Sequence, residues 1–169
     1  MKNIYRLAAS ALAFIVFGIQ TNAQSTATAS TTATLITPIS ISKSFDMDFG
    51  TVAASSTAGT IVLDYADGAT ATGGTSIPAG SAPKTAVFAV TGEGNSGFSI
   101  SIPTSPITLN GSVSGTLTVD NFAADLGTAS TLSSGEATVK VKAVLNVPAN
   151  AVAGTYSNAS DLFVTVNYN

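Results

Sequence analysis

The sequence predicts an all-β fold: an antiparallel β-sandwich of about eight strands, preceded by a cleaved signal peptide. Small hydroxyl side chains are common, with 21 Ser and 24 Thr among 169 residues, which is typical of strands and turns. Apolar and polar residues alternate along several short segments, as half-buried strands require. No segment after the signal peptide keeps a 3.6-residue apolar period, and prolines interrupt the places where a helix could start.

Residues 1–23 have the three zones of a secretory signal. A basic start containing Lys2 and Arg6 is followed by an apolar run from Leu7 to Ile19 and then by a small-residue exit. The run is shorter than the roughly 20 residues that a spanning helix needs. We therefore expect secretion through the Sec pathway to the periplasm, cell surface or extracellular space, with no membrane span after cleavage. The alternative is an uncleaved amphipathic or buried helix.

Composition argues against an enzyme. The chain has no His and no Cys, so a Ser-His-Asp or Cys-His relay and the usual thiolate and imidazole zinc site are excluded. Only carboxylate or hydroxyl chemistry remains, and no cofactor is predicted. Without disulfides, packing must supply the stability.

The charge balance argues against nucleic acid as a partner. Cleavage after residue 23 leaves four basic and nine acidic residues, a net charge of −5. The four lysines, Lys43, Lys84, Lys140 and Lys142, are scattered, whereas a phosphate-binding face needs clustered positive charge.

The rest of the chain divides into an arm and one domain. Residues 24–34 are low in complexity, with Ala alternating against Ser and Thr and almost nothing large to bury. We expect a flexible or weakly paired arm, and a single β-sandwich domain over residues 35–169. Ordered structure is expected to begin around Leu35 and Ile36.

Each strand of the domain is predicted from its alternation. Phe45, Met47 and Phe49 show the period of two in a short form. The predicted strands lie near residues 35–41, 45–49, 60–65, 85–91, 98–102, 109–122, 139–145 and 162–168. Turn-rich pieces such as Asp67-Gly68 separate them. A barrel is the alternative, but short strands with long Gly- and Ser-containing connections favour two packed sheets.

The segment from Leu145 to Tyr156 has the apolar, loop, Gly, Tyr order of a tyrosine corner. In that motif the ring packs at a sheet crossing and the hydroxyl bonds to upstream backbone. The alternative is an ordinary loop followed by a strand tyrosine.

Three stretches carry a family resemblance. They read TATLITPISISKSFDMDFGTV at 32–52, GG at 73–74, and VPANAVAGTYSNASDLFVTVNYN at 147–169. Through them the chain resembles the bacterial secreted family catalogued as domain of unknown function 4402, over nearly the whole length after the signal. More distantly, DFGTV, AGTY and the penultimate tyrosine are similar to spore-coat U and chaperone–usher pilin domains.

The resemblance implies an exported immunoglobulin-like, pilin-like sandwich and a role as an assembly subunit. It supplies no catalytic residue. The chain differs from the pilins because it lacks their cysteine pair.

The terminal strand is the candidate assembly strand. Its apolar face consists of Leu162, Val164, Val166 and Tyr168, which a periplasmic chaperone or a second copy could pair with by strand addition. The alternative is a core strand of a complete sandwich. The N-terminal arm could be the donor in such an exchange, although its small side chains would fill few pockets.

Two carboxylate pairs are weak metal candidates. Asp46 and Asp48 are expected to point the same way on a strand, and Asp64 and Asp67 lie beside Gly68. Such oxygens suit calcium, and paired carboxylates also serve glycosidases. Against both readings, Asp before Gly is common in turns for backbone reasons alone.

These observations predict an exported, non-enzymatic structural or adhesive subunit at the cell surface or outside the cell. The alternative is a monomeric extracellular binding module for a glycan or a calcium ion. Sugar stacking would need exposed aromatic rings, and the only tyrosines after the signal are Tyr65, Tyr156 and Tyr168.

Overall fold

The computed structural model describes residues 24–159 and 162–169, so the predicted signal peptide lies outside the described residues. Two units are distinguished, which meet between Thr34 and Leu35. In the first unit, residues 24–34 are exposed and form no regular secondary structure. The described residues contain strands and no helix, and therefore no helix suited to crossing a membrane.

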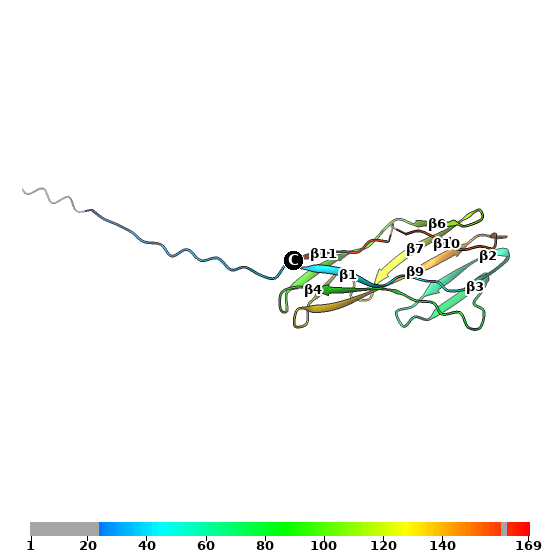
Figure 1. Ribbon diagram of the computed structural model, residues 1–169, viewed down its shortest axis with the longest axis horizontal. Helices are drawn as coiled ribbons and strands as arrows, with labels where there is room; N and C mark the ends of the chain where they lie inside the picture. Colours follow the sequence, from blue (N-terminus) through cyan, green and yellow to red (C-terminus); the bar gives the residue numbers. More distant parts are fainter. Residues whose placement is uncertain (1–23, 160–161) are drawn as a thin grey trace, which may run out of the picture. The chain divides into compact units, whose positions relative to one another are not determined.

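The second unit is all-β, as predicted, with eleven strands in its described part (Figure 1). They are β1 (Ser40–Phe45), β2 (Ala53–Leu63), β3 (Ala69–Ser76), β4 (Ala86–Thr91), β5 (Gly97–Ser101), β6 (Ile107–Gly111), β7 (Thr116–Ala124), β8 (Ala129–Thr131), β9 (Glu136–Val147), β10 (Tyr156–Ser157) and β11 (Thr165–Tyr168). The count exceeds the predicted eight because β3, β8 and β10 contain few large apolar residues, so alternation could not reveal them.

The strands form two antiparallel sheets. The larger sheet has the order β1-β4-β9-β7-β6-β10, with β2 paired to β9 and β3 to β2, and the smaller sheet has the order β11-β5-β8. The long strand β9 is the centre of the larger sheet. Its first half pairs with β4 and its second half with β2, while β7 lies along its other edge. In Figure 1, β1 and β4 therefore lie toward one end of this unit, and β2, β3 and β6 toward the other.

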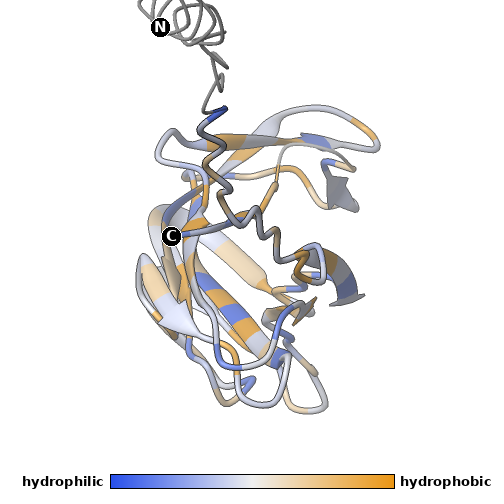
Figure 2. Cartoon of the chain, turned by 90° about the vertical axis from the view of Figure 1, so that its left-hand side faces the viewer, coloured by the Kyte–Doolittle hydropathy of each residue, from blue (hydrophilic) through white to orange (hydrophobic). Residues whose placement is uncertain are grey.

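The core has two parts, one at each end. In the first, the smaller sheet packs against the larger one. This cluster contains Ala86, Phe88, Val90, Phe98, Ile100, Leu132, Val139, Val141 and Val166. Because strand side chains alternate between faces, every second residue of β4 and β9 is buried. The same alternation of hydrophobic and hydrophilic residues is visible along the strands in Figure 2.

The second part of the core lies under the other half of the larger sheet. It contains Phe49, Ile61, Leu63, Leu117, Val119, Ala143, Leu145 and Val147. Apart from Phe49, these residues come from β2, β7 and β9, and none comes from the smaller sheet. Connecting segments, not strands of a second sheet, face this half.

Several predicted strands differ from the structure. The predicted strand at 109–122 is two strands, β6 and β7. Phe45–Phe49 is not a strand: β1 ends at Phe45, and beyond it only Asp48 makes an isolated bridge, to Lys84. The register shifts between Lys43 and Phe45, and the Phe45 side chain is 61% exposed. Met47 is half-buried and Phe49 is buried, so the apolar period reported burial for two of its three residues although no strand forms there.

The chain also enters the sheet later than predicted. The first strand begins at Ser40, and Leu35 and Ile36 are 92% and 54% exposed. The last strand is shorter at its start, because β11 begins at Thr165 and not at Leu162. Pro38 cannot donate a ladder hydrogen bond, which accounts for the late start of β1.

Candidate functional site

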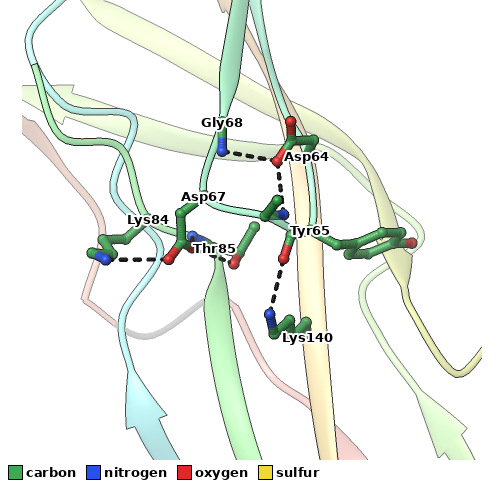
Figure 3. A network of polar contacts seen from close by, with 8 residues as sticks. Asp64, Tyr65, Asp67, Gly68, Lys84, Thr85 and Lys140 are labelled. Carbon is green, nitrogen blue, oxygen red and sulfur yellow. Dashed lines mark hydrogen bonds and ion pairs between the residues drawn. The ribbon is translucent and has the colours of Figure 1, made fainter.

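The turn between β2 and β3 holds one of the predicted carboxylate pairs (Figure 3). Asp64 Oδ1 accepts the backbone N–H groups of Ala66 and Gly68, at 2.7 and 2.8 Å. A Cβ at Gly68 would overlap the Asp64 carboxylate, so a side chain there would displace this carboxylate from its present position. Asp64 therefore holds the turn in shape.

Asp67 joins this turn to the start of β4. Its Oδ1 accepts the backbone N–H and the hydroxyl of Thr85, at 2.9 and 2.8 Å, and its Oδ2 accepts Lys84 Nζ at 3.1 Å. These bonds lower the pKa of Asp67 to about 2, and the bond from the Thr85 backbone has the largest effect. Thr85 is fully buried, so Asp67 supplies the acceptor that its two donors need.

The same turn is tied to the middle of β9. Lys140 Nζ donates to the backbone carbonyl of Tyr65 at 3.0 Å, and Lys142 Nζ lies 4.7 Å from the centre of the Tyr65 ring. Burial, and then the charge of Asp125, raises the pKa of Tyr65. One face of the ring is thus occupied by a cation.

The other carboxylate pair is not on a strand, so the two side chains are not aligned by strand alternation as predicted. Asp46 forms an exposed ion pair with Lys43, and Asp48 accepts the backbone N–H of Gly50 at 2.7 Å. All four aspartates therefore bond within the chain. Within the described ranges, no three His, Cys, Asp or Glu side chains gather where they could hold a metal ion.

The predicted assembly strand packs onto the first part of the core. Val166 is buried, and Leu162, Val164 and Tyr168 are half-buried against the same cluster. β11 pairs with β5 through Thr165–Tyr168 and forms one edge of the smaller sheet. The apolar face of β11 is thus directed into the core. The backbone edge of β11 that does not pair with β5 borders no strand of that sheet.

Tyr168 also holds the segment that precedes β1. Its hydroxyl donates to the carbonyl of Thr37 at 2.7 Å and accepts the backbone N–H of Glu93 at 2.5 Å. The Glu93 carboxylate accepts the backbone N–H of Thr37 at 2.8 Å, and this bond lowers the pKa of Glu93. We call these three residues the Thr37 clamp.

A groove of about 920 Å³ lies over the second part of the core. Its floor is the inner face of the larger sheet, formed by apolar side chains of β4, β6, β7 and β9. They are Ala86, Phe88, Ile107, Leu109, Leu117, Val119, Phe122, Leu145 and Val147. Most of these side chains would lie beneath a second sheet in a sandwich that was closed along its whole length.

Two connecting segments form the walls of the groove. One wall is residues 46–54, which connect β1 to β2 and include the first two residues of β2. The other is residues 151–159, which include β10, together with Leu162. The second wall contains the tyrosine corner, which the structure confirms, since Tyr156 donates its hydroxyl to the Val152 carbonyl at 2.6 Å. Both walls run beside the groove as extended or turn segments, so polypeptide backbone borders it along two sides.

Sequence reasoning missed the groove and the clamp. Alternation identifies which residues face inward, but it does not tell whether a second layer covers them. Tyr168 and Glu93 are 75 residues apart, and Tyr168 and Thr37 are 131 apart, so no local spacing could signal the clamp. The only available signal was the failure of residues 50–54 and 148–159 to alternate as strands.

A family model described as domain of unknown function (DUF4402) matches residues 39–168. No curated protein and no solved structure matches the chain significantly.

Proposed function

The chain belongs to the DUF4402 family, and from that premise we propose that it is an exported, non-enzymatic structural or adhesive subunit. It acts at the cell surface or outside the cell and assembles by strand addition. The signal-like zones of residues 1–23 and the likeness to pilin and spore-coat domains support export and assembly. The family description itself names no activity.

One observation carries the proposal: the groove leaves half of the sandwich without a second sheet. An extended segment lying between the two walls would cover the half-buried apolar residues of the floor, such as Leu109 and Phe122. It would also have backbone on either side to pair with, which is how strand addition obtains its affinity. A small polar ligand would instead need converging polar groups, whereas this floor is apolar.

The segment that best fits the groove comes from a second copy of this chain. Residues 24–34 are exposed and without regular structure, and they have the β propensity of Ser and Thr. The small side chains of this arm alone would fill little of the groove. Leu35 and Ile36, which are 92% and 54% exposed, add the large side chains that the arm lacks.

A non-enzymatic role is supported by the state of the carboxylates. Asp67 is held as an anion with a pKa of about 2, which suits a structural acceptor and not a general acid near neutral pH. Asp64 is occupied by two backbone donors of its own turn. The aspartates therefore serve the fold.

The test measures assembly of the exported protein. The full coding sequence is expressed, and the processed product is expected to have the intact mass of a chain starting at Gln24. Light scattering after size exclusion should show species larger than a monomer. An excess of a peptide copying residues 24–36 should reduce them and raise the melting temperature by several degrees, because a ligand of the folded state stabilises it.

A pair of variants on one strand provides the matched control. Leu109→Glu places a charge in the groove and should reduce assembly, whereas Thr108→Glu places the same charge on the exposed outer face of β6 and should not. A product that stays strictly monomeric, with a melting temperature unchanged by the peptide, would refute the proposal.

A further inference from the structure

We propose that the Thr37 clamp fixes the path of Leu35–Ile39 so that this segment serves a second copy and does not turn back into its own groove. The inference rests on the proposed function and specifies how its assembly site is controlled. Three observations carry it: the bonding of Thr37, the direction of the chain, and the exposure of the residues that precede the clamp.

The clamp takes both backbone groups of Thr37. Glu93 accepts the N–H of Thr37, and Tyr168 donates to its carbonyl. Tyr168 and Glu93 are themselves joined, because the tyrosine hydroxyl accepts the Glu93 N–H. A Cβ at Gly92 would overlap the Tyr168 hydroxyl, so the neighbouring glycine is what lets the ring reach this position.

At Thr37, hydrogen bonds to side chains take the place of the backbone hydrogen bonds that a neighbouring strand would supply. β1 begins at Ser40, opposite Thr91. Pro38 lies two residues before Ser40 and has no N–H to donate. Proline also restricts the residue before it to extended conformations. Thr37 is thus extended by its sequence and held in place by Tyr168 and Glu93.

The direction of β1 carries the preceding residues away from the groove. β1 runs from Ser40, opposite Thr91, to Phe45, beside the groove residue Asp46. Thr91 pairs with Glu136 at the start of β9, and the groove reaches Val147 at its end. Residues 35–39 therefore continue past the end of the sheet that is remote from Val147, at about 3.3 Å per residue.

Filling its own groove would require the chain to reverse direction next to Thr37. The clamp opposes that reversal, since a reversed path would break both Thr37 bonds. The exposure of Leu35 agrees with a segment held off the domain. Each copy then has its donor segment at one end and its groove toward the other. Copies joined in this way make head-to-tail contacts, which propagate as an open chain unless the rotation between copies closes a ring.

The clamp is tested by a distance that does not depend on assembly. Spin labels are attached at Leu35→Cys and Val113→Cys in the exported protein; both sites are exposed and lie at opposite ends of the domain. The labelled protein is diluted into an excess of unlabelled protein, and electron–electron distances are measured. The clamp predicts one narrow, long distribution, and Tyr168→Phe is expected to broaden it and add shorter distances.

In each variant the loss of one hydrogen bond to Thr37 should change the ratio of held to released segment about two- to tenfold, with a matching fall in the assembled fraction. Glu93→Ala should act in the same direction without altering the C-terminal strand. Glu136→Ala removes the same charge from the exposed start of β9 and should change neither readout.

The outcomes separate the two proposals. If Tyr168→Phe and Glu93→Ala both keep the narrow distribution, the clamp is refuted, whether or not the protein assembles. If Tyr168→Phe does not fold, Glu93→Ala alone decides by the same criterion. A monomeric wild-type protein refutes the proposed function, while a broad wild-type distribution refutes the clamp.

Discussion

At the scale of single residues, several aspartates of this protein form hydrogen bonds that hold its own turns and strands in place. Asp64 closes a turn, Asp67 satisfies a buried threonine, and Asp48 bonds to a glycine two residues later. Such roles suit a chain rich in turns, because an aspartate can bond to nearby backbone N–H groups. They explain why aspartate pairs in the sequence did not converge on one site.

Asp67 provides a prediction about pH. Its pKa is about 2 in the folded protein against an ordinary 3.8. A lowered folded pKa gives stability that is present above the ordinary pKa and is lost as the pH falls toward the folded value. Asp67→Asn should therefore lower the urea midpoint at pH 7. The difference in urea midpoint between the variant and the wild type should shrink as the pH falls from about 4 to about 2.

Asparagine is the right replacement because Asp67 has a φ of +64°, a conformation that Asn tolerates better than most residues. Asp46→Asn is the control, since it removes an exposed ion pair worth little. Urea unfolding of the three proteins at several pH values measures the effect. A difference between Asp67→Asn and wild type that stays constant down to pH 2 would contradict this assignment.

At the scale of elements, some strands were predictable and their neighbours were not. In β9, Val139, Val141, Ala143 and Leu145 are all buried, as their alternation indicated. In β3 the sequence ATATGGTS has no large apolar residue, so its pairing with β2 could be learned only from the tertiary structure. Alternation predicts a strand when one face is buried, and it says little about edge strands of small residues.

The tyrosine corner gives a prediction at this scale. The Tyr156 hydroxyl donates to the carbonyl of Val152 while its ring packs on the second part of the core. Tyr156→Phe keeps the ring and removes the hydrogen bond, so it should lower the free energy of unfolding by about 0.5–1.5 kcal/mol. Urea denaturation measures this, with Tyr65→Phe as the control. Equal effects of the two changes would argue against a special role for the corner.

At the scale of the whole domain, the two parts of the core differ in how they are covered. The first part lies between two sheets, and the second lies between one sheet and two connecting segments. Both parts share β9, which passes through them in one continuous strand. We therefore expect one cooperative unfolding transition together with local opening at the groove end, because parts of a fold with fewer buried contacts open more easily.

Hydrogen exchange followed by mass spectrometry tests this unequal coverage. Amides of β4 and β5 should exchange slowest, because strands pair on both sides of most of them and the two sheets bury their side chains. Amides of β6 and β10 should exchange faster, since β10 pairs through only Tyr156 and Ser157 and the neighbouring groove lies open.

Adding the peptide that copies residues 24–36 should slow exchange at the groove end and leave β5 unchanged. Equal slowing in both halves would mean that the peptide does not act at the groove, and equal exchange without peptide would mean that the connecting segments cover the core as well as a sheet does.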